Sequence, residues 1–156
     1  MIRYFLFLTI TLTTLVSCGQ KSEKTKTTYN FELSDAAWQE KLTPEQYRVL
    51  RKSGTEQAFT GKYWNNKKQG TYSCAGCNQA LFLSNTKFKS GTGWPSFYTF
   101  VENSVGVGTD YDLGYARDEV YCTNCGGHLG HVFKDGPKPT GLRYCINSAS
   151  LNFKED

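Results

Sequence analysis

Apolar and polar residues divide the chain into three stretches. Residues 4–16 are predominantly apolar, residues 19–28 are polar and rich in Lys and Thr, and the remainder mixes aromatic, aliphatic and polar positions. The second stretch carries too little apolar surface to fold alone. We therefore expect one folded domain over residues 31–156, a size that suits a single hydrophobic core.

Two short helices are expected to open this domain. The clearer one covers residues 44–52, because Thr43 is a good N-cap, Gln46 completes a capping box, and proline stands at the first helical position. Gly54 follows as the residue expected to end this helix in a left-handed conformation. The segment 35–42, preceded by a serine that can cap it, is the second candidate helix.

Beyond residue 70 the pattern changes to short aromatic and β-branched runs separated by Gly, Asn and Asp. Runs at this spacing predict antiparallel sheet. The Gly-Val-Gly segment 106–108 has no helical pattern after it, so we interpret it as a hairpin turn rather than a phosphate-binding loop. The expected strands cover residues 71–73, 80–83, 96–101, 114–121, 129–133, 143–146 and 149–153.

The first apolar stretch is typical of an export signal. Arg3 precedes a run too short to span a bilayer as a helix, and residues 1–17 end in Leu-Val-Ser before Cys18. This ending resembles the processing site of bacterial lipoproteins, at which the cysteine is lipidated. We expect a protein of the bacterial cell envelope, anchored to a membrane by lipidated Cys18 and a polar tether over residues 18–30. An ordinary cleaved signal is the alternative.

The charge balance excludes one class of partner. The whole chain has a formal charge of +4, but from Tyr29 onward 14 Lys and Arg residues stand against 13 Asp and Glu residues. A domain so close to neutrality has no basic footprint for nucleic acid. We expect a monomer that does not bind nucleic acid.

Four of the six cysteines form two Cys-x-x-Cys pairs. Two residues between ligands let one tight turn direct both sulfurs at one ion, and Asn78 and Gly126, which follow the pairs, tolerate the backbone angles of such turns. Four thiolates suit tetrahedral zinc and leave no open position, so the metal would be structural. Two disulfides and a redox Cys-x-x-Cys are the alternatives. The expected zinc ligands are Cys74, Cys77, Cys122 and Cys125.

Cys145 is left without a partner once Cys18 and the four ligands are assigned. A lone cysteine in a strand is by default a small buried hydrophobe. Arg143, two residues away on the same face of a regular strand, would stabilise the thiolate and lower the thiol pKa. Asn147 would continue that face as a hydrogen-bond donor. These neighbours make Cys145 a candidate reactive thiol.

The two histidines and one tryptophan complete the candidate chemistry. His128 and His131 are spaced i, i+3, which places both on one face of a strand only where a bulge intervenes. They are surplus to the zinc but suited to proton transfer near a thiolate, although each could be structural. Trp94 stands between Gly and Pro, either as a core residue or as a displayed ring that receives a thioether-like methyl group.

In this order, the motifs resemble those of the methionine-R-sulfoxide reductases, the B-type family that reduces the R epimer of methionine sulfoxide in proteins and as the free amino acid. The resemblance covers roughly Phe31 to Phe153. It rests on the two cysteine pairs, Gly-Trp-Pro-Ser-Phe, His-Leu-Gly-His-Val-Phe and Arg-Tyr-Cys-Ile-Asn-Ser. It implies a mainly β fold of two packed antiparallel sheets, with short N-terminal helices and a structural zinc site.

The resemblance also implies roles for individual residues. Cys145 would attack the sulfoxide sulfur and become a sulfenic acid as methionine departs. The other implied site residues are His128 and His131 for protonating and binding the oxygen, Arg143 and Asn147 for the polar side, and Trp94 and Phe133 for the ε-methyl group.

One departure from the family pattern concerns recycling. Many members have a resolving cysteine where this chain has Thr92. The resemblance therefore implies a one-cysteine cycle, in which a small thiol or a thioredoxin-like protein reduces the sulfenic acid of Cys145 directly. From the residues alone two rival classes stay open: a non-catalytic zinc module of the envelope, and a disulfide-stabilised envelope protein without metal.

Overall fold

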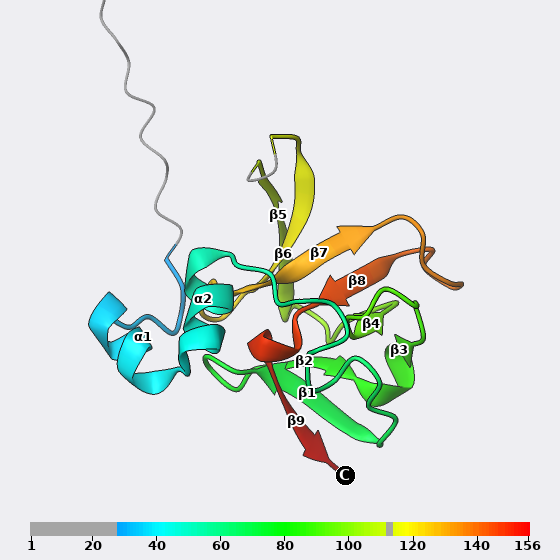
Figure 1. The fold of residues 1–156 in the computed structure, drawn as a ribbon, viewed down its shortest axis with the longest axis horizontal. Helices are drawn as coiled ribbons and strands as arrows, with labels where there is room; N and C mark the ends of the chain where they lie inside the picture. Colours follow the sequence, from blue (N-terminus) through cyan, green and yellow to red (C-terminus); the bar gives the residue numbers. More distant parts are fainter. Residues whose placement is uncertain (1–27, 112–113) are drawn as a thin grey trace, which may run out of the picture.

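A computed structural model of the chain describes residues 28–111 and 114–156 (Figure 1). The expected signal segment 1–17 and the lipidation site Cys18 lie outside the described residues, so both stay predictions from the sequence. Across the part that is described, none of the helices combines the length and the apolar character that crossing a membrane requires.

Helices come first and sheet follows, as the hydrophobic pattern predicts. In the described residues, α1 (Asp35–Lys41) and α2 (Pro44–Lys52) precede nine strands and two short 3-10 helices, η1 (Ser84–Thr86) and η2 (Ser148–Ser150). The strands are β1 (Gly70–Cys74), β2 (Ala80–Leu83), β3 (Lys87–Phe88), β4 (Ser96–Phe97), β5 (Val105–Asp110), β6 (Arg117–Cys122), β7 (His128–Phe133), β8 (Arg143–Ile146) and β9 (Leu151–Glu155).

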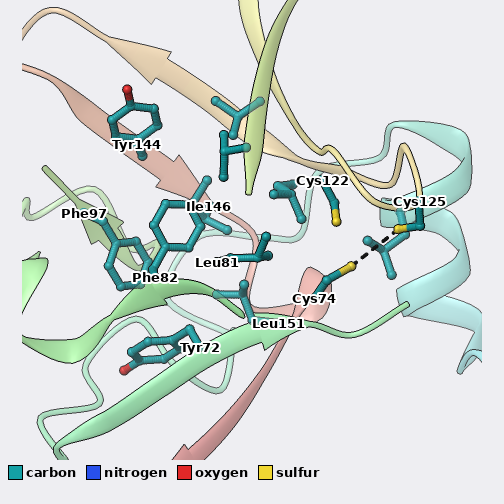
Figure 2. Close-up of a cluster of buried hydrophobic side chains, with 14 of the residues drawn as sticks. Tyr72, Cys74, Leu81, Phe82, Phe97, Cys122, Cys125, Tyr144, Ile146 and Leu151 are labelled. Atoms are coloured by element: carbon teal, nitrogen blue, oxygen red, sulfur yellow. Dashed lines mark hydrogen bonds between the residues drawn. The ribbon is translucent and has the colours of Figure 1, made fainter. Parts of the chain in front are cut away.

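The strands form two antiparallel sheets, which confirms the expected mainly β fold. One sheet has the order β2-β1-β9, and the other has the order β3-β4-β8-β7-β6-β5. Aromatic side chains pack between them (Figure 2). The ring of Phe97 on β4 lies 4.4 Å from that of Phe82 on β2 and 5.1 Å from that of Tyr72 on β1. All three side chains are fully buried, so they form the centre of the core.

The ends of α2 follow local sequence signals, with one correction. The side chain of Thr43 accepts a hydrogen bond from the N–H of Gln46, and the Gln46 side chain accepts one from the N–H of Thr43, as expected of a capping box. At the other end, Ser53 rather than Gly54 is left-handed, with φ 53°. The N–H of Gly54 donates to the carbonyl of Arg48, and a Cβ at Gly54 would lie 2.9 Å from that oxygen. Glycine is needed there for close approach, not for its dihedral angles.

The interpretation of segment 106–108 as a hairpin turn is wrong, because it lies within β5, which pairs with β6. The ring of Tyr121 on β6 covers Gly106, where a Cβ would lie 2.3 Å from a ring carbon. The glycine therefore permits a close cross-strand approach inside a strand. Three other expected strands differ by more than one residue at an end: only residues 96 and 97 of the expected strand 96–101 form β4, the expected strand 114–121 begins at Arg117 as β6, and the expected strand 149–153 begins inside η2.

Strands β7 and β8 lie in the middle of the larger sheet, where each is hydrogen-bonded to a neighbour on both edges. Helix α2 packs against β7 and against η2, and its Val49 and Leu50 are buried. Side chains on β7 and β8 are therefore held in fixed positions, which makes these strands suitable carriers of a functional site.

Candidate active site and metal-binding cluster

Four cysteines from two turns converge on one point. The sulfurs of Cys74, Cys77, Cys122 and Cys125 lie within 4.8 Å of one another, and all four are free thiols. The Cys74 and Cys125 sulfurs are 3.7 Å apart (Figure 2). Those of Cys77 and Cys122 are 3.6 Å apart. A tetrahedral zinc ion with bonds of about 2.3 Å places its sulfur ligands about 3.8 Å apart, whereas a disulfide requires about 2.05 Å. The cluster fits a metal ion and contradicts the disulfide alternative.

The same turn presents each cysteine pair. The N–H of Asn78 donates to the carbonyl of Cys74, and that of Gly126 to the carbonyl of Cys122, each at 2.8 Å. Both predicted turn residues are left-handed, with φ of 62° and 67°. The first turn joins β1 to β2 in the smaller sheet, and the second joins β6 to β7 in the larger one. A bound ion would therefore tie the two sheets together.

Burial makes a cation necessary if all four sulfurs are to be thiolates. Cys74, Cys122 and Cys125 are buried, and hydrogen bonding with Cys122 and the other cluster thiols, together with burial, raises the pKa of Cys74. Four anions in such a space are unfavourable without a positive ion among them. Among the described residues, the potential ligand group contains these cysteines and neither histidine. The histidines are thus left for another role, as expected.

Cys145 lies on β8, outside the metal cluster. It stands directly opposite His131 on β7 and Ser96 on β4. Its sulfur is 3.9 Å from the hydroxyl oxygen of Thr92. Among the cysteines of residues 28–111 and 114–156, it is the one that takes no part in the cluster. The fold thus brings the predicted nucleophile and one predicted histidine onto adjacent strands.

The expected lowering of the Cys145 pKa is wrong. Burial raises the pKa of this thiol, and the effect exceeds the opposing influence of the Arg143 charge and of the hydrogen bond with Thr92. Arg143 is itself held by Asp135, whose carboxylate accepts two hydrogen bonds of 2.9 Å. The guanidinium also lies 4.4 Å from the centre of the Phe133 ring. The arginine charge is therefore shared, and the resting Cys145 is a neutral thiol near pH 7.

A bulge brings the two histidines to one face of the sheet. His131 pairs with Glu119 and His128 pairs with Tyr121, so three steps along β7 match two steps along β6. The two imidazole centroids are 5.3 Å apart. Residues spaced i, i+3 share a face of a strand only where a bulge intervenes, and the bulge found here meets that condition.

A carboxylate holds each imidazole. Glu119 Oε1 lies 2.7 Å from His128 Nδ1, and Asp110, which also pairs with Arg117, is hydrogen-bonded to His131 Nε2. Burial lowers the pKa of His131 by more than the Asp110 hydrogen bond raises it. His128 Nε2 is buried and has no hydrogen-bond partner among the described residues. A buried nitrogen of this kind is suited to bind a ligand.

Glu56 connects the tryptophan loop to the end of β8. Its carbonyl accepts a 3.1 Å hydrogen bond from Trp94 Nε1, and its N–H donates at 2.9 Å to Asn147 Oδ1. Its buried carboxylate accepts from the N–H groups of Ser148, at 2.6 Å, and Ala149, at 2.9 Å. One residue therefore fixes both the ring of Trp94 and the segment that follows Cys145.

Three further predicted site residues differ in how closely their positions match their expected roles. The Asn147 amide donates to the carbonyl of Leu129 at 3.0 Å, so the predicted donor stabilises the fold instead of continuing the face of Cys145. Trp94 is half-buried and lies outside the main core cluster, in the wall of a cavity. Phe133 is 39% exposed and covers one side of Arg143.

The acidic partners of the site were missed by the sequence reasoning. Asp110 lies on β5, a strand that the pattern indicates as a turn. Glu119 lies on the expected strand β6, but its contact with His128 depends on how β6 pairs with β7 across the bulge. Glu56 acts on residues more than 90 positions away, which no local signal reveals. Only Asp135, two residues after Phe133, was close enough to the histidine motif to be suspected.

Fold and site together define a mainly β thiol protein, in which a four-cysteine metal cluster joins two sheets and a separate cysteine stands beside paired imidazoles. A family model described as the SelR domain matches residues 42–155. The peptide methionine sulfoxide reductase MsrB of Leptospira interrogans is 57% identical over 129 residues, which cover 82% of this chain and 98% of that protein.

The enzymes of the same name from Agrobacterium fabrum and Methanosarcina barkeri are 57% and 56% identical to this chain. The matched regions cover 78% and 80% of this chain, and 90% and 89% of those proteins. The chain belongs to the MsrB family of peptide methionine sulfoxide reductases. Membership confirms the resemblance and the enzyme class, and it removes the non-catalytic zinc module as an alternative.

Proposed function

We propose that this chain reduces methionine-R-sulfoxide, free or within oxidised proteins, to methionine, and that Cys145 is the nucleophile. The observation that carries the proposal is the position of Cys145. It is the described cysteine outside the metal cluster, and it lies opposite His131 in a protein of the MsrB family.

The resting protonation states supply the proton that this reaction needs. As the Cys145 sulfur attacks, the sulfur–oxygen bond of the sulfoxide breaks and an oxygen–sulfur bond to Cys145 forms. The methionine sulfur gains two electrons and the Cys145 sulfur loses two, while the thiol proton ends on the transferred oxygen. Burial raises the pKa of Cys145 and lowers that of His131, so the pair holds one proton that His131 can carry from sulfur to oxygen.

The surrounding side chains would orient the sulfoxide. His128 keeps Nδ1 on Glu119 and presents the buried Nε2, which has no partner among the described residues, to the sulfoxide. We infer that Arg143 contacts the polar side of the substrate and that Trp94 and Phe133 surround the ε-methyl group, the half-buried Trp94 and exposed Phe133 rings offering apolar surface. Asn147, whose amide is bound to Glu56 and Leu129, would support the polar side by holding the end of β8 in place.

Recycling is proposed to use one cysteine. Thr92 lies 3.9 Å from the Cys145 sulfur, at the position where the family resemblance places a resolving cysteine. A direct route remains, in which two external thiols, or one thioredoxin-like dithiol, are oxidised to a disulfide. The sulfenic acid of Cys145 returns to thiol and its oxygen leaves as water.

The bound metal is proposed to be zinc, with a structural role, because four sulfur ligands complete a tetrahedron and leave no position for substrate. We also propose that the enzyme is a monomer held at the cell envelope by lipidated Cys18. The support for the anchor is the apolar run and the residues before Cys18.

The function is tested with an equal mixture of the R and S sulfoxide epimers of L-methionine and excess dithiothreitol. We expect conversion to methionine to stop at half of the starting material, with the S epimer left, as chiral chromatography would show. Consumption of both epimers, or of the S epimer alone, contradicts the proposal.

The opposite pKa shifts of Cys145 and His131 predict a wide pH plateau in kcat/KM. Acidification through the lowered His131 pKa adds a second proton to the pair and removes the base. Activity is therefore lost only at pH values below 6.5, the ordinary pKa of histidine. Alkalinisation through the raised Cys145 pKa removes the shared proton and with it the acid. Activity is therefore lost only at pH values above 9.0, the ordinary pKa of the thiol. A pH–rate profile on methionine-R-sulfoxide tests this. A maximum below pH 6.5, or a steady rise past pH 9, contradicts it.

A further inference from the structure

A cleft of about 700 Å³ adjoins the loop that contacts the nucleophile. Ser90, Gly91, Gly93 and Trp94 form part of its wall, and Thr92, within the same loop, lies 3.9 Å from the Cys145 sulfur. The volume is within the range of ligand-binding pockets. One loop, residues 90–94, therefore contributes both to the wall of this cleft and to the surroundings of Cys145.

Positive charge is concentrated in the cleft. Its described lining contains four lysines, Lys67, Lys68, Lys87 and Lys89, and no acidic residue. These are four of only 14 cationic side chains in a domain that is almost neutral. Such a concentration of one sign of charge attracts an anionic ligand.

The four lysines differ in their contacts. Lys87 donates to the carbonyls of Trp64 and Asn66, each at 3.1 Å, and so holds one wall in place. Lys68 pairs with Glu155 at the rim, at 2.6 Å. Lys67 and Lys89 are exposed, and neither forms an ion pair within the described residues. These last two are the cations available to a ligand.

Two exposed aromatic rings lie beside these charges. Phe59 is 56% exposed and Trp64 is 37% exposed, with centroids 5.4 Å apart. Phe59 has φ 67°, a conformation that a bulky residue rarely adopts, and its N–H donates to the carbonyl of Gly93 at 2.9 Å. A strained backbone that keeps an aromatic ring in solvent is typical of a binding surface.

We propose that this cleft binds an acidic, aromatic-containing segment of the substrate polypeptide, next to its oxidised methionine. The inference rests on the proposed function, which it extends from the sulfoxide to the flanking sequence. Lys67 and Lys89 attract the carboxylates, and Phe59 and Trp64 pack against apolar side chains. A polypeptide is favoured over a nucleic acid because the loop that lines the cleft also contacts Cys145, where the ligand must present a sulfoxide.

The test compares three peptides that carry one methionine-R-sulfoxide between Asp-rich, Asn-rich or Lys-rich flanks with one Phe each. We expect kcat/KM to be about tenfold higher for the acidic than for the basic peptide, mainly through KM, and the difference to shrink at high salt. The double variant Lys67→Glu/Lys89→Glu should reverse the order. The control Lys41→Glu/Lys154→Glu changes the net charge equally at exposed positions outside the cleft and should keep the order.

Binding of the same peptides to the Cys145→Ser chain, followed by tryptophan fluorescence, tests the cleft apart from turnover. Equal affinities and equal kcat/KM values overturn the cleft and leave the proposed function standing. Loss of turnover on every substrate, with acidic peptides still preferred in binding, overturns the function and supports the cleft. Inhibition by a single-stranded oligonucleotide, without any preference among peptides, overturns the proposal in favour of a nucleic-acid site.

Discussion

Replacing Cys145 with serine is expected to abolish turnover, with a loss of at least about a thousandfold in kcat/KM. The cause is chemical, because a serine hydroxyl neither ionises as a thiol does nor accepts an oxygen to form a sulfenic acid. Serine is close to cysteine in size, and position 145 is half-buried between β4 and β7, so the sheet should stay intact. The measurement is methionine formed from methionine-R-sulfoxide with dithiothreitol.

Metal content and melting temperature show whether the Cys145→Ser chain loses activity for a chemical reason or because its structure is damaged. The Cys145→Ser chain should keep one metal ion per molecule and melt within a few degrees of the unmodified chain, because Cys145 is outside the cluster. Retention of a tenth or more of the original rate contradicts the assignment of Cys145 as nucleophile.

Replacing Cys77 with serine should have the second large effect, on stability. The four cysteines join turns from two sheets, so losing one ligand removes the connection between them. Structural zinc sites contribute about 10–16 kcal/mol of apparent binding free energy in small peptides, comparable with the whole stability of a domain, about 5–15 kcal/mol. We expect the melting temperature to fall by at least about 15 °C, because even 5 kcal/mol corresponds to such a shift at this size.

Cys77 is the suitable position because it is only half-buried, whereas Cys74, Cys122 and Cys125 are buried and their loss would also disturb packing. Calorimetry with metal analysis on the same samples is the measurement, and the Cys145→Ser chain is the matched cysteine control. A chain that has lost its metal but melts within about 3 °C of the original would show that the ion does not hold the sheets together.

Local signals made part of this structure predictable. The capping box of Thr43 and Gln46 lies within one turn of α2, and each Cys-x-x-Cys turn closes within five residues. The residues that decide such features are neighbours in the chain. Their outcome therefore depends little on the rest of the fold, and both were predicted from spacing alone.

Features that depend on distant residues were not predictable. The glycine at position 106 indicates a turn until the ring of Tyr121 is placed over it across the sheet. The charge state of Cys145 depends on how deeply β8 is buried, which outweighs the adjacent Arg143. Glu56 binds the segment after Cys145 from more than 90 residues away. In each case tertiary contacts decide the outcome.

The central claim is that the oxygen of methionine-R-sulfoxide is transferred to Cys145 and to no other residue of the chain. A single turnover without any reductant, followed by a sulfenic-acid trap and peptide mass spectrometry, tests it most directly. The account predicts one methionine formed per chain, one label on Cys145, and four cluster cysteines that remain unmodified with their metal bound. An internal disulfide, a label on a cluster cysteine, or methionine formed without any change at Cys145 would contradict it.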